Sequence, residues 1–251
     1  MTPYPETFPV PLLLVERTNS TSSYLRDLLR KEVPAAFTTI LADYQTAGRG
    51  QRGNSWESEE GRNLLFSFIL FPDFLEARRQ FLLSQITALS IKEVLDRYTE
   101  GITIKWPNDI YWQERKICGM LIENELQGNC ICQTIAGVGI NINQQKFYSS
   151  APNPVSLWQI TNKDHDCLDI LEQVMKRIQE YYTSLLRGNG AMIATRYQDA
   201  MFRKKGMYPY IDNNGQFLAE IVRIGPDGSL VLKDDSGKER KYTFKEVQYC
   251  L

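Results

Sequence analysis

The pattern of apolar residues changes near Phe202. Before that residue, segments of strand length such as NLLFSFILF (63–71) alternate with longer segments whose apolar residues recur at helical spacing. After it, short alternating strands are separated by the turn sequences NNG, GPDG and DDSG. Because the first part has few βαβ repeats, this order predicts an α+β fold in which helices cover one face of a mixed sheet. We expect two domains, 1–201 and 202–251, and we expect the second to lie outside the ligand pocket.

Helices are predicted where apolar residues repeat every three to four positions, and strands where β-branched and aromatic residues dominate. The first helix has Ser20 or Thr21 as its candidate N-cap residue. The predicted helices cover 20–33, 75–98, 168–187 and about 191–202; the predicted strands cover 37–45, 63–70, 102–107, 116–126 and 131–143, after an irregular entry strand at 1–11.

Composition and charge exclude several classes of protein. Charged residues make up 24% of the 251 residues and the formal net charge is -1, so bulk electrostatics disfavour binding to DNA or RNA. No apolar run approaches the roughly 18 residues that a membrane-spanning helix needs. The first residues lack the cationic region of a signal peptide, so we expect a cytoplasmic protein that does not bind membranes.

Histidine and cysteine lack the number or spacing that common catalytic and metal sites require. The single histidine, His165, lies in the polar segment TNKDHDC, which we expect to be an exposed loop before a helix. The five cysteines form no C-x-x-C pair, and we expect them to be buried and inert; Cys130 and Cys132 would share one face of a strand. A histidine-based triad or a multi-histidine metal centre is therefore excluded. Any chemistry must use lysine, arginine, carboxylates and the backbone.

A segment rich in glycine and arginine, ADYQTAGRGQRGNSWES (42–58), follows the strand predicted at 37–45. Its glycines allow the backbone to approach a ligand closely, and Arg49 and Arg52 are suited to carboxylate or phosphate groups. The letters GRGQRG match the dinucleotide-binding pattern G-x-G-x-x-G, but no amphipathic helix follows them, and no G-K-[ST] completes a Walker A loop. We interpret the segment as an anion-binding loop, with a solvated hairpin as the alternative.

Two further segments place polar residues at the ends of apolar strands. In TIKWPNDIYW a proline ends the strand, so Asn108 and Asp109 should project from a rigid turn and suit a nucleobase, a ribose or Mg²⁺. Lys116 begins the next strand, either as an anion ligand or as a solvated edge charge. In AGVGININ, glycines precede Asn141 and let a flat ligand approach the strand. With the glycine loop, these segments predict one pocket for a nucleotide and a second anionic group.

Five segments resemble, in order and spacing, the motifs of the biotin–protein ligases, also called biotin–[acetyl-CoA-carboxylase] ligases. The resemblance extends over essentially the whole chain, from NSTSSYL to FKEV, and KWPND is its most diagnostic string. The five segments are NSTSSYL (19–25), DYQTAGRGQRGNSW (43–56), KWPNDIY (105–111), RKICGMLIE (115–123) and AGVGININ (136–143).

The resemblance implies a reaction in two steps. Biotin and ATP, with Mg²⁺, would form biotinyl-5′-AMP and pyrophosphate, and a lysine of a biotin carboxyl carrier protein or domain would then take the biotinyl group and release AMP. The implied fold is a mixed sheet with flanking helices, related to class II aminoacyl-tRNA synthetases, followed by a C-terminal SH3-like barrel. Fixed cations suit this chemistry because a carboxylate and a triphosphate must be brought together.

The resemblance also implies a role for individual residues. Lys116 and Arg49 would be catalytic and bridge the biotin carboxylate and the α-phosphate. Biotin would contact Ser20, Thr21, Ser22, Gln45, Gly48, Arg49, Gly50, Gln51, Lys116 and Gly119. ATP would contact Arg52, Trp56, Lys105, Asn108, Asp109, Gly139 and Asn141, with Trp56 stacked near the adenine and Asp109 on the ribose or at Mg²⁺.

Two departures from the family pattern qualify the resemblance. Gln51 stands where many members have a further arginine, so the loop carries one cation fewer there. The first motif begins by residue 19, which leaves no room for the N-terminal DNA-binding domain of some members, so we expect the monofunctional form without repressor activity. A lipoate–protein ligase and a non-catalytic nucleic-acid-binding protein are the alternative interpretations. A homodimer through an edge of the main sheet is compatible with the pattern.

Overall fold

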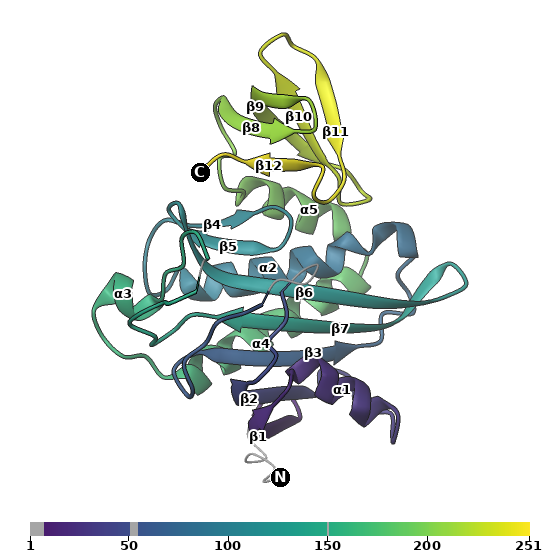
Figure 1. The fold of residues 1–251 in the computed structure, drawn as a ribbon. Helices are drawn as coiled ribbons and strands as arrows, with labels where there is room; N and C mark the ends of the chain where they lie inside the picture. The colour runs from purple at the N-terminus through teal and green to yellow at the C-terminus, as the bar shows by residue number, and fades with distance from the viewer. Residues whose placement is uncertain (1–7, 51–54, 150) are drawn as a thin grey trace.

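A computed structural model describes residues 8–50, 55–149 and 151–251 of the chain. Within these residues, seven strands form a mixed main sheet in the order β1-β2-β3-β7-β6-β5-β4 (Figure 1). Only β1 and β2 run parallel; the other neighbours in this sheet are antiparallel. The strands are β1 (Leu12–Thr18), β2 (Thr39–Gln45), β3 (Leu64–Leu70), β4 (Ile102–Lys105), β5 (Asp109–Trp112), β6 (Arg115–Gln127) and β7 (Cys130–Ile140).

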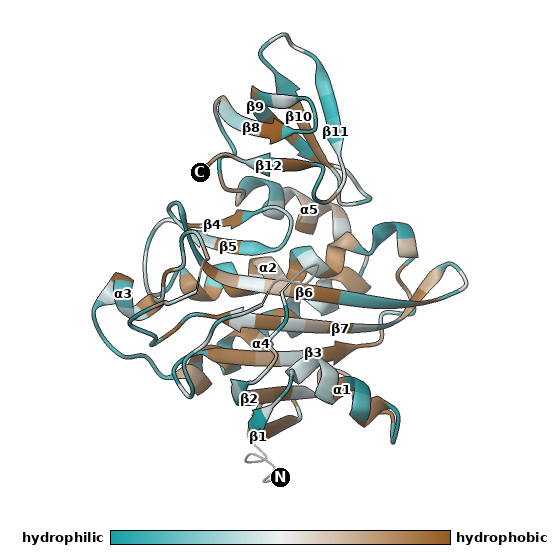
Figure 2. Cartoon of the chain, viewed as in Figure 1, coloured by the Kyte–Doolittle hydropathy of each residue, from teal (hydrophilic) through white to brown (hydrophobic). Residues whose placement is uncertain are grey.

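The centre of the main sheet is buried on both faces. Every residue of β3 is buried, and the strand is hydrophobic along its length in Figure 2, with Ser67 as the exception. Phe66 and Phe68 belong to the larger apolar core, whereas Ile69 belongs to a smaller one on the other face. Successive residues of a strand point to opposite faces, so Ser67 shares the face of Ile69. This placement brings a hydroxyl into the site described below.

The sequence predicted that all helices would cover one face of the main sheet. This prediction is wrong, because the helices lie on both faces. The larger core includes α2 (Phe81–Leu95), α4 (Cys167–Leu186) and α5 (Gly190–Asp199), which cover one face. Helix α1 (Thr21–Leu29) packs on the opposite face, where Leu25 joins the smaller core. The reason is that α1 connects the parallel strands β1 and β2 and must cross over the sheet. It covers only part of its face, and the rest carries the site.

The last strands form a separate antiparallel sheet in the order β11-β10-β9-β8-β12, at the top of Figure 1. Its residues follow the expected boundary near Phe202. The indole Nε1 of Trp106 donates a hydrogen bond of 2.8 Å to the carbonyl of Gly228, and the Trp106 ring lies against Phe244, which joins this sheet to the main one. The strands are β8 (Tyr208–Asp212), β9 (Gly215–Ile224), β10 (Leu230–Asp234), β11 (Glu239–Tyr242) and β12 (Val247–Tyr249).

Most predicted elements are confirmed, but four elements of the structure were not anticipated: β1, β5, a short helix and a 3-10 turn. Strand β1 begins at Leu12, beyond the entry strand predicted at 1–11, whose first seven residues lie outside the described part. Asp109 begins strand β5 instead of projecting from a turn, because KWPND continues a hairpin with β4. Helix α3 (Leu157–Thr161) is short and begins with a capping box between Ser156 and Gln159. The helix predicted at 75–98 begins only at Phe81, after a 3-10 turn (Ala77–Arg79).

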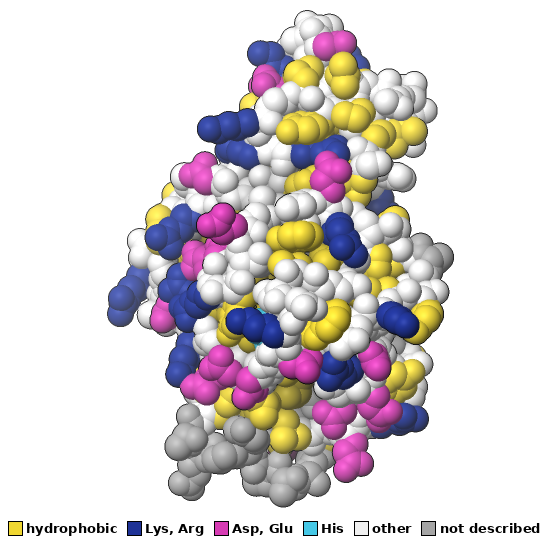
Figure 3. Space-filling view, turned by 90° about the vertical axis from the view of Figure 1, so that its left-hand side faces the viewer, with side chains coloured by type: hydrophobic (Ala, Val, Ile, Leu, Met, Phe, Trp, Pro, Cys, Tyr) yellow, Lys and Arg dark blue, Asp and Glu magenta, His cyan; other side chains and the backbone are white. Residues whose placement is uncertain are grey.

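The surface shows no segregation of charge on the face drawn in Figure 3. There, Lys and Arg side chains lie among Asp and Glu side chains instead of forming one continuous basic area. This agrees with the near-zero net charge of the chain. Among the described residues, no helix combines the length and the apolar character that crossing a membrane requires.

Candidate active site

A cluster of hydroxyl groups lies where α1 begins. The hydroxyl of Ser67 lies 2.6 Å from that of Thr21 and 2.9 Å from that of Ser22. Gln45, at the end of β2, accepts hydrogen bonds of 2.8 and 3.2 Å from the backbone N–H and hydroxyl of Thr21. Ser20 occupies the N-cap position, but its side chain makes no capping hydrogen bond. Gln45 instead accepts the hydrogen bond from the first backbone N–H of the helix. The Ser20 hydroxyl therefore remains available to a ligand.

This cluster lines a small cavity of about 50 Å³, which we call the small cavity. Its other wall is the surface of β6 and β7. At Gly137 a Cβ atom would lie 2.6 Å from the Ser22 hydroxyl, so only glycine lets α1 approach β7 this closely. Eight of the residues that the family resemblance assigns to biotin line this cavity: Ser20, Thr21, Ser22, Gln45, Arg49, Gly50, Lys116 and Gly119.

Trp56 packs on the glycines of the same two strands. A Cβ atom at Gly139 would lie 2.5 Å from its ring, and one at Gly119 would lie 2.9 Å from it. Both glycines therefore make room for the indole. Its Nε1 is buried and has no hydrogen-bond partner among the described residues. The ammonium of Lys116 lies 5.6 Å from the ring centroid, within the range of a cation–π contact.

Lys116 forms an ion pair with Asp109. Its Nζ lies 2.7 Å from Asp109 Oδ1, and the two side chains are 32% and 17% exposed. The backbone N–H of Lys116 donates to the carbonyl of Asn153, which holds the start of β6. The alternative of a solvated edge charge is therefore wrong, because the register of β5 and β6 places a carboxylate beside the lysine.

Two asparagines are held by the backbone of neighbouring strands and loops. Asn108 donates a hydrogen bond of 2.5 Å from its amide to the carbonyl of Met120. Asn141 is buried, and its amide donates to the carbonyl of Val155 at 3.1 Å. The buried Oδ1 of Asn141 has no hydrogen-bond partner among the described residues. Such an acceptor is costly to leave unpaired, so a ligand donor is its natural partner.

A large cavity of about 770 Å³ lies between the main sheet and the C-terminal sheet; we call it the large cavity. Lys105, Asn108, Asp109 and Asn141 line it, as expected for a nucleotide site. The expectation that the C-terminal sheet lies outside the pocket is wrong for this cavity. The segment packs against the hairpin of β4 and β5, and so forms its other wall with Phe244, Lys245, Val247, Gln248, Tyr249 and Leu251.

The two cavities meet at shared residues. Lys116 and Trp56 line both of them, as do Gly50 and Asn108. A group in the small cavity and a group in the large cavity would therefore face each other across Lys116. This junction is the central geometric feature of the site.

The glycine loop is described only in part. The guanidinium of Arg49 is exposed and donates a 3.0 Å hydrogen bond to the hydroxyl of Ser23 on α1. Gly48 is buried and lies beside Gln45 without lining either cavity, and Gly139, expected on the nucleotide side, lines the small cavity. The other two ligand candidates of the loop, Gln51 and Arg52, lie outside the described residues.

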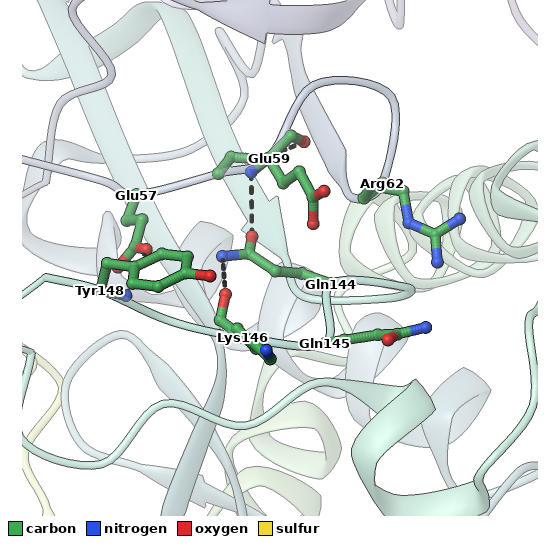
Figure 4. A pocket seen from close by; sticks show the side chains of 8 residues that line it. Glu57, Glu59, Arg62, Gln144, Gln145, Lys146 and Tyr148 are labelled. Atoms are coloured by element: carbon green, nitrogen blue, oxygen red, sulfur yellow. Dashed lines mark hydrogen bonds between the residues drawn. The ribbon is translucent and has the colours of Figure 1, made fainter.

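A third cavity, of about 620 Å³, lies beside the segment that follows Trp56 (Figure 4). Gln144 accepts a hydrogen bond from the backbone N–H of Glu59 and donates one to the carbonyl of Lys146. The carboxylate of Glu57 accepts bonds from the backbone N–H groups of Tyr148 and Ser149. None of the expected ligand residues in the described part lines this cavity. Its contacts instead hold two loops together next to the site.

The described residues contain no group of three or more His, Cys, Asp or Glu side chains that could hold a metal ion. Mg²⁺ commonly binds through one or two carboxylates together with substrate phosphates, and Asp109 fits that role. His165 is partly buried instead of exposed, with its Nε2 2.7 Å from the hydroxyl of Thr161. Of the five free cysteines, only Cys118 is fully buried, and burial raises its pKa, so it is an inert thiol.

Sequence reasoning missed two residues of the site. Ser67 is a single hydroxyl within an otherwise apolar strand, and that isolation was the signal available. Tyr249 of β12 lines the large cavity, but nothing in its local sequence marks it. It reaches the cavity only because the C-terminal sheet packs on the main one.

The site thus consists of two adjoining cavities that share an ion-paired lysine, Lys116. Comparison with known proteins gives the family. The model of the biotin/lipoate A/B protein ligase family matches residues 14–141, just over half of the 251 residues. The chain therefore belongs to this family.

Individual relatives can be aligned with this chain over most of its length. It is 28% identical over 233 residues to the bifunctional ligase/repressor BirA of Bacillus subtilis, covering 90% of this chain and 70% of that protein. It is 26% identical to the biotin–[acetyl-CoA-carboxylase] ligase of Paracoccus denitrificans, covering 90% and 95% of the two chains. The structure of the biotin protein ligase of Aquifex aeolicus with biotin and ATP matches with a TM-score of 0.78 and 28% identity, over 95% of this chain and 99% of that one.

Proposed function

We propose that this chain is an ATP-dependent biotin–protein ligase. It forms biotinyl-5′-AMP from biotin and ATP, and then transfers the biotinyl group to a specific lysine of a biotin carboxyl carrier domain. The Aquifex relative binds biotin and ATP, and the Paracoccus relative is a biotin–[acetyl-CoA-carboxylase] ligase, which supports the assignment.

The observation that carries this proposal is the junction of the two cavities at Lys116. The hydroxyl cluster and Gln45 suit the polar ureido ring of biotin, which carries N–H donors and a carbonyl acceptor. Asn141, with a buried and unpaired Oδ1, suits the amino group of adenine. The biotin carboxylate and the α-phosphate would then meet beside Lys116.

The first step joins the two substrates. A biotin carboxylate oxygen attacks the α-phosphorus of ATP, the new O–P bond forms, and the bond to the pyrophosphate oxygen breaks. Negative charge increases on the transferred phosphoryl group, and the ammonium of Lys116 and the guanidinium of Arg49 would stabilise it. Mg²⁺ would neutralise phosphate charge when bound, and Asp109, which lines the large cavity, would be its carboxylate ligand.

The second step consumes the mixed anhydride. The amine of a carrier lysine attacks the biotinyl carbonyl carbon, the bond to the AMP oxygen breaks, and AMP leaves with the electron pair. The attacking nitrogen releases one proton to solvent, which leaves an amide bond. No side-chain nucleophile of this chain takes part, which agrees with its single histidine. The site must keep water from the anhydride until the carrier arrives.

In this proposal the side chain of Trp56 changes position when biotin binds. A volume of about 50 Å³ is well below the roughly 300 Å³ of common ligand pockets, and the indole occupies the space over the glycines. Biotin binding would therefore displace Trp56. Because Trp56 also lines the large cavity, its ring could then stack on the adenine.

The finer fold assignment belongs to the same proposal. We infer a catalytic domain at 1–201 of the type found in class II aminoacyl-tRNA synthetases, and an SH3-like barrel at 202–251. The mixed seven-stranded sheet and the separate five-stranded antiparallel sheet support this division.

The test is direct. The chain is incubated with biotin, ATP, Mg²⁺ and a biotin-acceptor domain, and transfer is read on a streptavidin blot, while pyrophosphate release is followed separately. We expect biotin-dependent pyrophosphate release and a labelled acceptor. The acceptor with its target lysine changed to arginine is the matched control and should stay unlabelled.

The family model covers lipoate as well as biotin ligases, so lipoate is tested in parallel. Pyrophosphate release that depends on lipoate and not on biotin would replace the proposed substrate. The absence of release with either acid would overturn the proposed reaction.

A further inference from the structure

An ion pair connects helix α1 to strand β6. The guanidinium of Arg26, in the last turn of α1, pairs with the carboxylate of Glu123 on β6. The two side chains are 32% and 37% exposed, so solvent and salt screen the pair only in part. Helix α1 joins β1 and β2 at one edge of the main sheet, whereas β6 lies beyond β3 and β7 (Figure 1). The pair therefore links the helix to a strand on the far side of the site.

Glu123 lies just beyond one end of the small cavity. Gly119, Leu121 and Glu123 alternate along β6, so they share the face of the sheet that carries the site. Gly119 lies under Trp56, and Leu121 lines the cavity. Glu123 comes next along the strand, in the direction away from Lys116. The ion pair therefore borders the end of the small cavity that is opposite the junction with the large cavity.

The same order of contacts is found along α1. The hydroxyl of Ser22 lies against Gly137, where a Cβ atom would come within 2.6 Å of it. Arg26 follows Ser22 by about one helical turn, so both side chains lie on the same side of α1. Gly137 pairs with Leu121, two positions before Glu123. The hydroxyl contact and the ion pair are thus successive contacts between one helix and one face of the sheet.

A second contact on this side of α1 comes from the glycine loop. Arg49 donates a hydrogen bond of 3.0 Å to the hydroxyl of Ser23. Arg49 also lines the small cavity, and the proposed function assigns it to the reacting carboxylate and phosphate. In that role Arg49 would exchange Ser23 for the substrates. The ion pair of Arg26 would then hold this side of the helix while the substrates are bound.

We propose that Arg26 and Glu123 are positioning residues for biotin, because their ion pair holds the beginning of α1 at a fixed distance from β6. This inference rests on the proposed function and extends it to two side chains that do not line the small cavity. The hydroxyls of α1 and the surface of β6 and β7 form opposite walls of that cavity. Hydrogen bonds weaken steeply with distance and angle, so a helix that moves away from β6 loses contact with the ligand.

The experiment measures biotin binding to the full chain by calorimetry, without ATP. Arg26→Met and Glu123→Gln each remove one charge and keep the approximate size of the side chain. We expect each to raise the Kd for biotin about threefold to fivefold, the range of a partly exposed ion pair. Arg30→Met is the matched control, because it breaks an ion pair with Asp27 that stays within the α1 segment. It should leave the Kd for biotin unchanged.

Exchange of the two charges separates this contact from a general loss of structure. Arg26→Glu and Glu123→Arg each bring like charges together and should weaken biotin binding more than the neutral variants do. The double variant Arg26→Glu/Glu123→Arg restores opposite charges and should return the Kd for biotin toward that of the wild type. The thermal midpoint of each variant checks the fold. Should a reversed variant fail to fold, the neutral variants decide the matter.

Unchanged biotin affinity in both neutral variants, or a double variant no better than the single reversals, would overturn the inference. The proposed function would stand in that case, provided that the wild type adenylates biotin. A wild type that binds biotin with the help of this ion pair but never adenylates it would overturn the proposed function and leave the inference standing. A wild type that binds no biotin would overturn both.

Discussion

Lys116 and Asp109 lie 2.7 Å apart where the two cavities meet, and each limits what the other does in the free protein. The ion pair orients the lysine ammonium and holds the carboxylate in the wall of the large cavity. In the proposed reaction, the two anionic substrates would give Lys116 stronger partners, and Asp109 would become available to Mg²⁺. Substitution of Lys116 therefore tests the proposed chemistry directly.

Lys116→Ala should slow adenylate formation by on the order of 10²–10³, because it removes a cation that acts mainly on the charge of the transition state. The fold should persist, since both members of the ion pair are partly exposed. Biotin-dependent pyrophosphate release checks the rate, and the thermal midpoint checks the fold. Release near the wild-type rate would show that Lys116 does not act on the reacting groups.

Ser67→Ala should weaken biotin binding and lower the free energy of unfolding by about 1–3 kcal/mol, because it leaves the hydroxyls of Thr21 and Ser22 without their shared partner. Calorimetry with biotin and urea unfolding measure the two effects. Ser90→Ala is the matched control, since Ser90 is a buried hydroxyl that bonds only within α2. It should change stability alone. Equal biotin affinity in both variants would contradict a role of the hydroxyl cluster in binding.

At the scale of elements, one face of the main sheet is covered by helices and the other face carries the small cavity. Helices α2, α4 and α5 close one face, whereas α1 covers only part of the other. The beginning of α1 and the glycines of β6 and β7 then form the small cavity between them. In the C-terminal sheet, some polar side chains stabilise turns between strands.

Asp234, the last residue of β10, stabilises the turn that leads to β11. It accepts hydrogen bonds from the hydroxyl and N–H of Ser236, from the N–H of Lys238 and from Arg240. The Ser236 hydroxyl is the main cause that lowers the pKa of Asp234 to about 2. A carboxyl with a lowered pKa contributes stability above its ordinary pKa near 3.8, and that contribution is lost as the pH falls toward about 2.

Asp234→Asn should therefore destabilise the protein at pH 7, and the difference from the wild type should shrink as the pH falls below about 4, because asparagine does not titrate. Urea unfolding at several pH values measures this difference. Asp235→Asn changes the exposed neighbouring residue and serves as the control. A difference that stays constant down to pH 2.5 would show that the ionised carboxylate is not what stabilises the turn.

At the scale of the whole molecule, the C-terminal sheet forms one wall of the large cavity, which the proposed function assigns to ATP. Its packing depends on Trp106, whose Nε1 bonds to the carbonyl of Gly228 and whose ring meets Phe244. The small cavity has no residue from this sheet among its lining residues in the described part of the chain. The two substrates should therefore respond differently when contact between the sheets is weakened.

Trp106→Phe should raise the KM for ATP several-fold and leave the Kd for biotin unchanged. It removes one hydrogen bond between the sheets, worth roughly 0.5–1.5 kcal/mol, while keeping an aromatic ring in the core. Steady-state kinetics and calorimetry give the two constants. The control is Trp112→Phe, which removes an indole bond to Glu100 within the main-sheet region. If Trp106→Phe weakened biotin binding and left the KM for ATP unchanged, the proposal that the C-terminal sheet affects ATP and not biotin would be wrong.

The amino-acid sequence by itself predicted an α+β fold with a mixed sheet, and it marked the change of pattern near Phe202 after which the second antiparallel sheet begins. It could do so because strand and helix periodicity is local, and because the glycine loop and KWPND carry their chemistry within a few residues. Ser20, Thr21, Ser22 and Gln45, which the family resemblance assigned to biotin, line one cavity, and their contact with biotin stays a prediction.

Only the tertiary structure decided how these segments meet. Ser67 joins the site because β3 pairs with β7 beneath α1, and Asp109 pairs with Lys116 because of the register between β5 and β6. Tyr249 reaches Lys105 across 144 positions of sequence, through the packing of one sheet on another. These contacts depend on which strands pair and which faces pack, and that choice is made by burial of apolar surface over the whole chain and not by any short segment of it.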